Sequence, residues 1–165
     1  MGLKKVKKTR FSLSHYKNEF LGLVEETDKK TLAFWAIDCV ERVMPYFEDK
    51  YPDDHRPREA IQALQDWIRT GKFSMKTIRG ASLTSHAAAR EVGEDNEARS
   101  VARAAGQAVA TAHVKTHSIG AAIYALQAIH RATDPIDVDA EVAKERDWQY
   151  QHLEELRELR QSNCE

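Results

Sequence analysis

The sequence has few of the residues that build disulfide-linked, strand-rich or membrane-spanning proteins. It contains two cysteines, seven glycines and four prolines in 165 residues. Cys39 and Cys164 do not make a disulfide framework and suit a reducing cytoplasm, where we expect the protein to be found. No run of about 18 apolar residues occurs, so we expect no membrane-spanning helix. The first residues also lack the apolar centre of a secretion signal.

No charge of either sign dominates the chain. The formal net charge is −1 at pH 7, which gives the whole molecule little attraction for nucleic acid or acidic membranes. Basic residues gather in an N-terminal arm, residues 1–11, which we expect to be solvated. Nucleic-acid binding would depend on this arm, with Phe11 and Tyr16 for stacking, so we do not expect it.

Apolar residues recur at helical spacing and do not alternate as they would in strands. Tyr16, Phe20 and Val24, for example, form a stripe four residues apart. The pattern predicts an all-α, single-domain bundle of six or seven helices. A helical core would cover residues 12–134, and residues 135–165 would form a long charged helix packed on the core or extending from it. The predicted helices are 12–26, 28–47, 57–70, 75–92, 96–112, 118–132 and 137–161.

The segment 96–112 is rich in alanine and small on most of its sides. Such a helix allows several neighbours to approach closely and has little reason to face water. We therefore predict that it is the central helix, with Ala105 and Ala108 fully buried.

Histidines mark a second candidate feature. His113 and His117 have the spacing of zinc ligands on one helix. However, Val114 breaks the HExxH signature, a helix break near Lys115 is expected, and no cysteine pair completes the ligands, so we predict no metal. His86 and Arg90 share a helix face. A polar pocket of Glu41, His86, Arg90, His113 and His117 is one interpretation, and a purely structural buried network is the other.

The clearest loop carries four charges between Pro52 and Pro57 or beside them. These are Asp53, Asp54, Arg56 and Arg58. The loop lacks the alternating acids and the glycine of a calcium loop. Its charges either bind a partner, at low entropic cost because the prolines stiffen the loop, or cap helices and pair locally.

Signatures of covalent catalysis and of nucleotide binding are missing. There is no GxSxG elbow and no glycine-rich phosphate loop. We therefore expect no cofactor and no catalytic residues.

Three stretches resemble the Imm-5-like putative immunity protein family. They are residues 34–43 (FWAIDCVERV), residues 53–67 with the acidic pair and Arg56-Pro57-Arg58, and residues 104–125 with His113, His117 and Gly120. The resemblance covers about residues 30–130, and the family usually shows histidine where this chain has Gln107. It implies a helical, non-catalytic protein that binds and neutralises a protein toxin. Two alternatives stay open: a small-molecule or metal-dependent enzyme using the histidines and Arg90, and a helical interaction module that forms a homodimer through its last helix.

Overall fold

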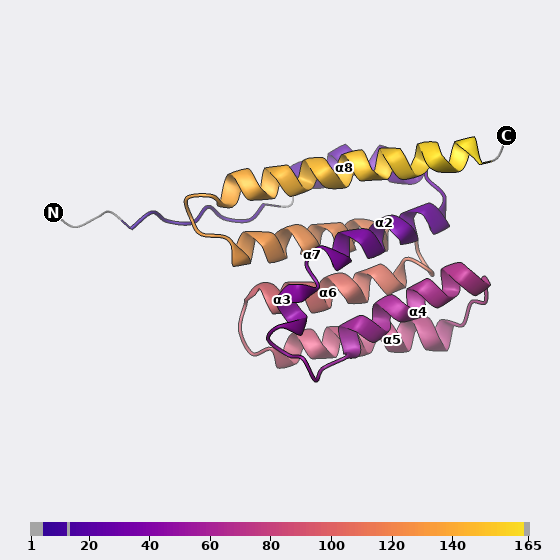
Figure 1. Cartoon of the computed structure of the whole chain (residues 1–165), viewed down its shortest axis with the longest axis horizontal. Coiled ribbons are helices and arrows are strands. Elements are labelled where there is room, and N and C mark those ends of the chain that lie inside the picture. Colours follow the sequence, from indigo (N-terminus) through magenta and orange to yellow (C-terminus); the bar gives the residue numbers. More distant parts are fainter. Residues whose placement is uncertain (1–4, 13, 164–165) are drawn as a thin grey trace.

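The computed structural model describes residues 5–12 and 14–163 and confirms an all-α, single-domain fold. No strand occurs among these residues. The helices follow the order shown in Figure 1. Their bounds are α1 (Ser14–Glu25), α2 (Lys29–Glu41), α3 (Pro45–Glu48), α4 (Arg56–Thr70), α5 (Met75–Glu91), α6 (Glu97–Ala110), α7 (His117–Ala132) and α8 (Val138–Ser162).

Polar side chains mark several helix starts, as the sequence indicates. Asp28, Ser74 and Asn96 each have an extended backbone and accept a hydrogen bond from the backbone N–H three residues later. These N-caps satisfy donors that the first helical turn leaves unpaired. Gly71 ends α4 in a left-handed conformation (φ 69°), which glycine adopts without a steric penalty.

The described part of the chain has eight helices, one more than the upper limit of the sequence-based prediction. The difference arises at Pro45, which divides the predicted helix 28–47 into α2 and α3. Proline has no N–H, so it cannot bond to the carbonyl of Glu41, and the ladder is interrupted there. Phe47 is nevertheless buried, as its place on the predicted stripe required.

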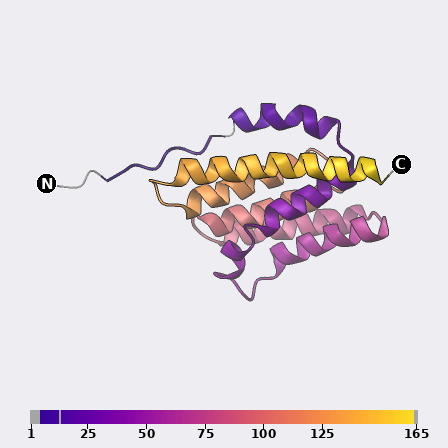
Figure 2. The same cartoon turned by 45° about the horizontal axis from the view of Figure 1, so that its top comes forward.

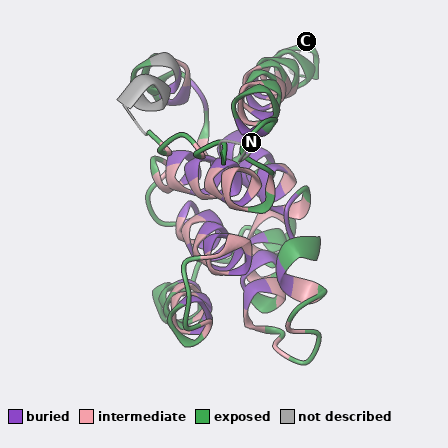
Figure 3. Cartoon of the chain, turned by 90° about the vertical axis from the view of Figure 1, so that its left-hand side faces the viewer, coloured by how far each residue is buried: buried purple, intermediate pink, exposed green. Residues whose placement is uncertain are grey.

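Helix α6 occupies the centre of the molecule, as predicted. It packs against α2, α3, α4, α5 and α7. Ala105 and Ala108 are fully buried, which confirms that expectation. Figure 3 shows buried residues gathered on the inner surfaces of the helices and exposed residues on the outside.

The long C-terminal helix α8 packs on the core, against α2 and α7. Leu153 is fully buried, and the buried indole of Trp35 donates its Nε1–H to the backbone carbonyl of Gln149 at 2.8 Å. Arg42 forms a bidentate pair with the buried carboxylate of Glu145, at 2.6 and 2.8 Å. The inner face of α8 is therefore covered by its own chain.

Two N-terminal segments lie over the helices near α7 and α8. Helix α1 forms an outer layer, visible in Figure 2, and buries Phe20 and Val24. The N-terminal arm was expected to be solvated, but part of it, within residues 8–11, contacts the helices. Lys8 donates to the carbonyls of His130 and Arg131 at the end of α7, and the hydroxyl of Thr9 donates to Asp139 of α8 at 2.5 Å. A cation at a helix C-terminus satisfies its last carbonyls and complements its dipole.

None of the helices in the described residues is both long and apolar enough to cross a bilayer.

Candidate functional site

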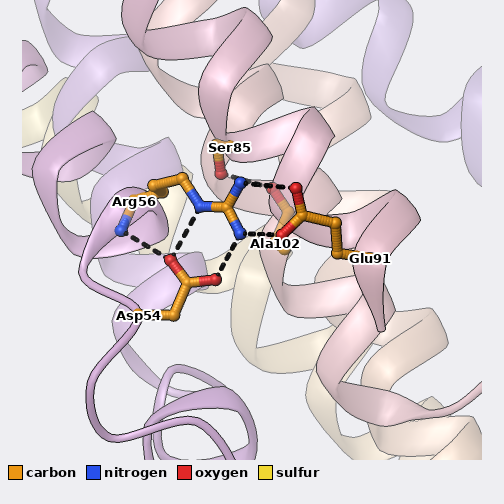
Figure 4. A network of polar contacts seen from close by, with 5 residues as sticks. All are labelled: Asp54, Arg56, Ser85, Glu91 and Ala102. Atoms are coloured by element: carbon orange, nitrogen blue, oxygen red, sulfur yellow. Dashed lines mark hydrogen bonds and ion pairs between the residues drawn. The ribbon is translucent and has the colours of Figure 1, made fainter. Parts of the chain in front are cut away.

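Three of the four charged residues at 53–58 form ion pairs within the chain, and Arg56 and Arg58 belong to the first turn of α4 rather than to the predicted loop. Arg56 binds Asp54 through two guanidinium hydrogen bonds of 2.9 and 2.6 Å, and it also reaches Glu91 of α5 at 3.1 and 2.5 Å (Figure 4). These bonds lower the pKa values of Asp54 and Glu91 and raise that of Arg56. Beside this network, Ser85 donates to the carbonyl of Ala102 at 2.7 Å, which fastens α5 to α6.

Arg58 pairs with two acidic residues that precede it in the chain. It donates to Glu48 at 2.8 Å and to Glu41 at 2.5 Å, and the hydrogen bond to Glu48 is the main cause that raises its pKa. Glu41 therefore lies beside Arg58 and not among the histidines. Asp53 is exposed. Of the four charged residues, it is the one that forms no ion pair in the described structure.

A second feature is an open groove where α5, the end of α6 and the start of α7 meet. We call it the histidine groove. Its cavity volume is about 370 Å³, a size usual for binding pockets. The lining residues are Met75, Ile78, Arg79, Ser82, Leu83, His86, Gln107, Ala110, His113 and His117.

Two glycines create the polar floor of the groove. A Cβ atom at Gly106 would lie 2.8 Å from Nε2 of His86, and one at Gly120 would lie 2.7 Å from Oε1 of Gln107. The ring and the amide can therefore settle against bare backbone. Gln107 Oε1 lies 2.8 Å from Nδ1 of His117, so an Nδ1–H tautomer would donate this bond and leave Nε2 as an acceptor.

The groove favours the neutral imidazole form of His86 and His117. Burial lowers the pKa of His86, and the charges of Arg103 and Arg90 lower it further. Burial also lowers the pKa of His117, with a smaller contribution from His113. No carboxylate is among the lining residues, so nothing in the groove favours protonation.

The structure brings together three of the five residues of the predicted polar pocket. His86, His113 and His117 line the groove, whereas Arg90 is an exposed neighbour of His86. His113 and His117 do not share a helix, because α6 ends at Ala110 and α7 begins at His117. Sequence reasoning missed Met75 and Leu83 as lining residues; their signal was large apolar side chains on the same α5 stripe as His86.

The described residues contain no group of three or more histidine, cysteine or acidic side chains placed to hold a metal ion. One nitrogen of His117 is already occupied by Gln107, at the position where the resemblance led us to expect histidine. An amide is a weaker metal ligand than an imidazole, so the groove is better suited to contacts with organic groups.

Fold and groove together define an all-α domain with an open, partly apolar surface site built from three helices. The profile of the Imm-5 like putative immunity protein family matches residues 22–156. The chain belongs to this family. The match includes most of α8, beyond the stretch where the resemblance was recognised from the sequence. No curated protein and no solved structure matches the chain.

Proposed function

We propose that this protein binds a protein toxin in the cytoplasm and neutralises it without catalysis. The observation that carries this proposal is the family match, which spans 22–156 and so includes nearly the whole helical bundle. A fully buried, unpaired thiol at Cys39, whose pKa is raised by burial, is compatible with a reducing compartment.

The chemistry of the histidine groove supports binding more than catalysis. General acid–base catalysis by histidine generally needs a partner that orients the ring and stabilises its charged form. His117 is held by the neutral amide of Gln107, and no carboxylate lines the groove. An enzyme that uses these histidines and Arg90 is therefore the less supported function.

Titration of a toxin distinguishes the two functions. The purified chain is added in increasing amounts to candidate toxins, chosen from toxin-like proteins that neighbouring genes encode, and each toxin's activity is measured. A stoichiometric binder abolishes activity at a fixed molar ratio, and unfolding or separating the complex restores an intact toxin. Complete inactivation by a small fraction of the molar amount, with a covalently altered toxin, would instead show an enzyme. No loss of activity at excess would refute toxin neutralisation.

The charged loop is tested best at Asp53. Asp54 holds Arg56, so reversing its charge would disturb the network in Figure 4 as well as any interface. Asp53→Lys removes an exposed charge without breaking a pair in the described structure. If the loop binds the toxin, Asp53→Lys weakens the complex and reduces its salt dependence, whereas Glu154→Lys on exposed α8 does not. Equal affinity of the two variants would exclude Asp53 from the interface.

A further inference from the structure

Large apolar side chains are exposed around the histidine groove. The described residues include ten exposed large hydrophobic side chains. Met75 and Leu83 line the groove, Phe73 stacks on His113, and Val114 follows His113 in the chain. Leu83 is 54% exposed and Phe73 47% exposed. Three of the ten, Met75, Leu83 and Phe73, thus gather at one site, and such clusters on a monomer mark interaction surfaces.

Arginines without an ion pair in the described structure lie in the groove or near its His86 ring. Arg79 lines it, and Arg90 and Arg103 lie close enough to His86 to lower its pKa. Arg90 follows His86 by one turn on α5, and Arg103 precedes Gln107 by one turn on α6. All three lack an ion pair among the described residues, while most arginines elsewhere in the chain have one. The charges of Arg79 and Arg103 are therefore available to a partner, whereas Arg90 also lowers the pKa of the adjacent Glu91.

The acidic residues of α5, of α6 and of the segment between them lie at the end of the two helices that is far from Met75 and Ala110. Between Trp67 and Thr133 the sequence has four acids: Glu91, Glu94, Asp95 and Glu97. All lie where α5 connects to α6, at the opposite end of both helices from Met75 and Ala110. Three of them are already paired, with Arg56, Arg99 and Lys50.

We infer that the histidine groove is the docking site for an acidic segment of a protein, with an apolar side chain of that segment inserted beside Met75 and Leu83. The inference extends the proposed function, on which the identity of the partner as a toxin rests. The site has the anatomy of a protein interface, an apolar and uncharged centre with a charged rim. The Gln107 amide and the His86 ring can donate hydrogen bonds to the segment, Nε2 of His117 can accept one, and the arginines without ion pairs match carboxylates by charge and fork geometry.

Other anionic occupants fit less well. A nucleic acid would place its phosphates against a row of cations, but three large apolar side chains interrupt this surface. A small anion would leave most of that exposed apolar area uncovered. The charge complementarity and the apolar area together favour a protein segment.

A displayed library of random 12-residue peptides is a direct probe of the groove. The library is selected on the full chain, and the enriched peptides are measured by calorimetry against the wild type, Arg79→Glu and Leu83→Glu. Lys144→Glu is the matched control, because it makes the same charge change at an exposed lysine of α8. We expect enrichment of two or more acids around an apolar residue, at least tenfold weaker binding to both groove variants, and unchanged binding to the control. Circular dichroism checks that each variant is folded.

Several results would overturn the inference. They are peptides without acidic enrichment, equal affinity for wild type and Arg79→Glu, or tighter binding of a fluorescent 12-nucleotide single strand than of any peptide. The toxin titration separates this inference from the proposed function. If Arg79→Glu and Leu83→Glu neutralise toxin as the wild type does, the groove is excluded while the function stands. If the wild type fails to neutralise toxin but acidic peptides still require Arg79, the groove stands without that function.

Discussion

Gly106 and Gly120 allow side chains from neighbouring helices to rest on bare backbone. Each lies in a helix interior, where glycine is ordinarily less favourable than alanine by about 0.5–1 kcal/mol. The space above them is filled by the ring of His86 and the amide of Gln107. Their cost to helix stability is therefore compensated by close packing at the histidine groove.

Two alanine substitutions separate these effects. Gly80 lies at an exposed position of α5, and a Cβ atom added there would meet nothing within 4 Å, so Gly80→Ala should raise the free energy of unfolding by about 0.5–1 kcal/mol. Gly106→Ala should instead lower it by about 1–3 kcal/mol and displace the His86 ring, because the new Cβ would lie 2.8–2.9 Å from that ring. Urea unfolding and the imidazole NMR signals measure both effects. An increase in stability for Gly106→Ala, with the His86 signals unmoved, would contradict the packing described here.

At the scale of single residues, the sequence predicted which small residues are buried. It did not predict which side chains pack against them. Ala105 and Ala108 were expected to be buried because a helix with small side chains on most of its sides allows neighbouring helices to approach closely and has little reason to face water. That Gly106 receives a histidine from α5 depends on how α5 and α6 are aligned, and helical periodicity does not encode this alignment.

At the scale of single helices, α8 is joined to α2 by polar as well as apolar contacts. His152 lies 2.6 Å from Asp38 and stacks on Trp148, and Arg42 lies over the Trp148 ring at 3.9 Å. From its charged composition and few large apolar residues, the sequence left open whether this helix packs on the core or extends from it. The packing of α8 on α2 could not be predicted from the apolar pattern alone, because charged residues of α2 and its C-cap make part of the contact.

The Arg42–Glu145 pair gives the sharpest test of this attachment. Arg42→Ala leaves the carboxylate of Glu145 buried without its guanidinium partner, so we expect a loss of about 1–3 kcal/mol. The double variant Arg42→Ala/Glu145→Gln should recover part of that loss, since an amide is less costly to bury than a charge. Arg69→Ala removes an exposed pair with Asp66 and should change stability by less than about 0.5 kcal/mol. A similar loss in Arg42→Ala and Arg69→Ala would show that the buried carboxylate is not the cause.

Helix boundaries were predicted closely where caps and breakers were recognised. Asn96, Gly71 and the Asp134-Pro135 pair lie at or near the predicted ends. The missed division at Pro45 has a simple origin: the apolar stripe continues to Phe47, and the stripe was followed past a residue that cannot join the hydrogen-bond ladder. The three groove histidines were identified as candidates, but Glu41 was assigned to them although Arg58 holds it.

For the whole molecule, the neutral groove histidines make stability dependent on pH. The pKa values of His86 and His117 are lowered in the folded protein, so the unfolded chain binds more protons as the pH falls through about 6.5. The free energy of unfolding should therefore decrease from about pH 7.5 to pH 5.5. Carboxylates with lowered pKa values, such as Asp54, act with the same sign, but in a more acidic range.

Thermal unfolding across this pH range tests the effect. The decrease in melting temperature should be smaller in His86→Gln and His117→Gln than in the wild type. His55→Gln, which removes an exposed histidine on the charged loop, should keep the full decrease. The same pH dependence in all four proteins would mean that the groove histidines are not responsible.

The contacts of residues 8–11 and α1 with the end of the chain constrain the order of events on the ribosome. Lys8 has a hydrogen-bond partner in α7, and Thr9 and Trp35 have theirs in α8. These segments therefore remain without their partners, with Phe20 and Trp35 incompletely covered, until α8 leaves the exit tunnel. Helices α4 to α7 pack largely on one another and can assemble earlier. Final closure therefore follows the synthesis of α8, when segments far apart in the sequence are brought together.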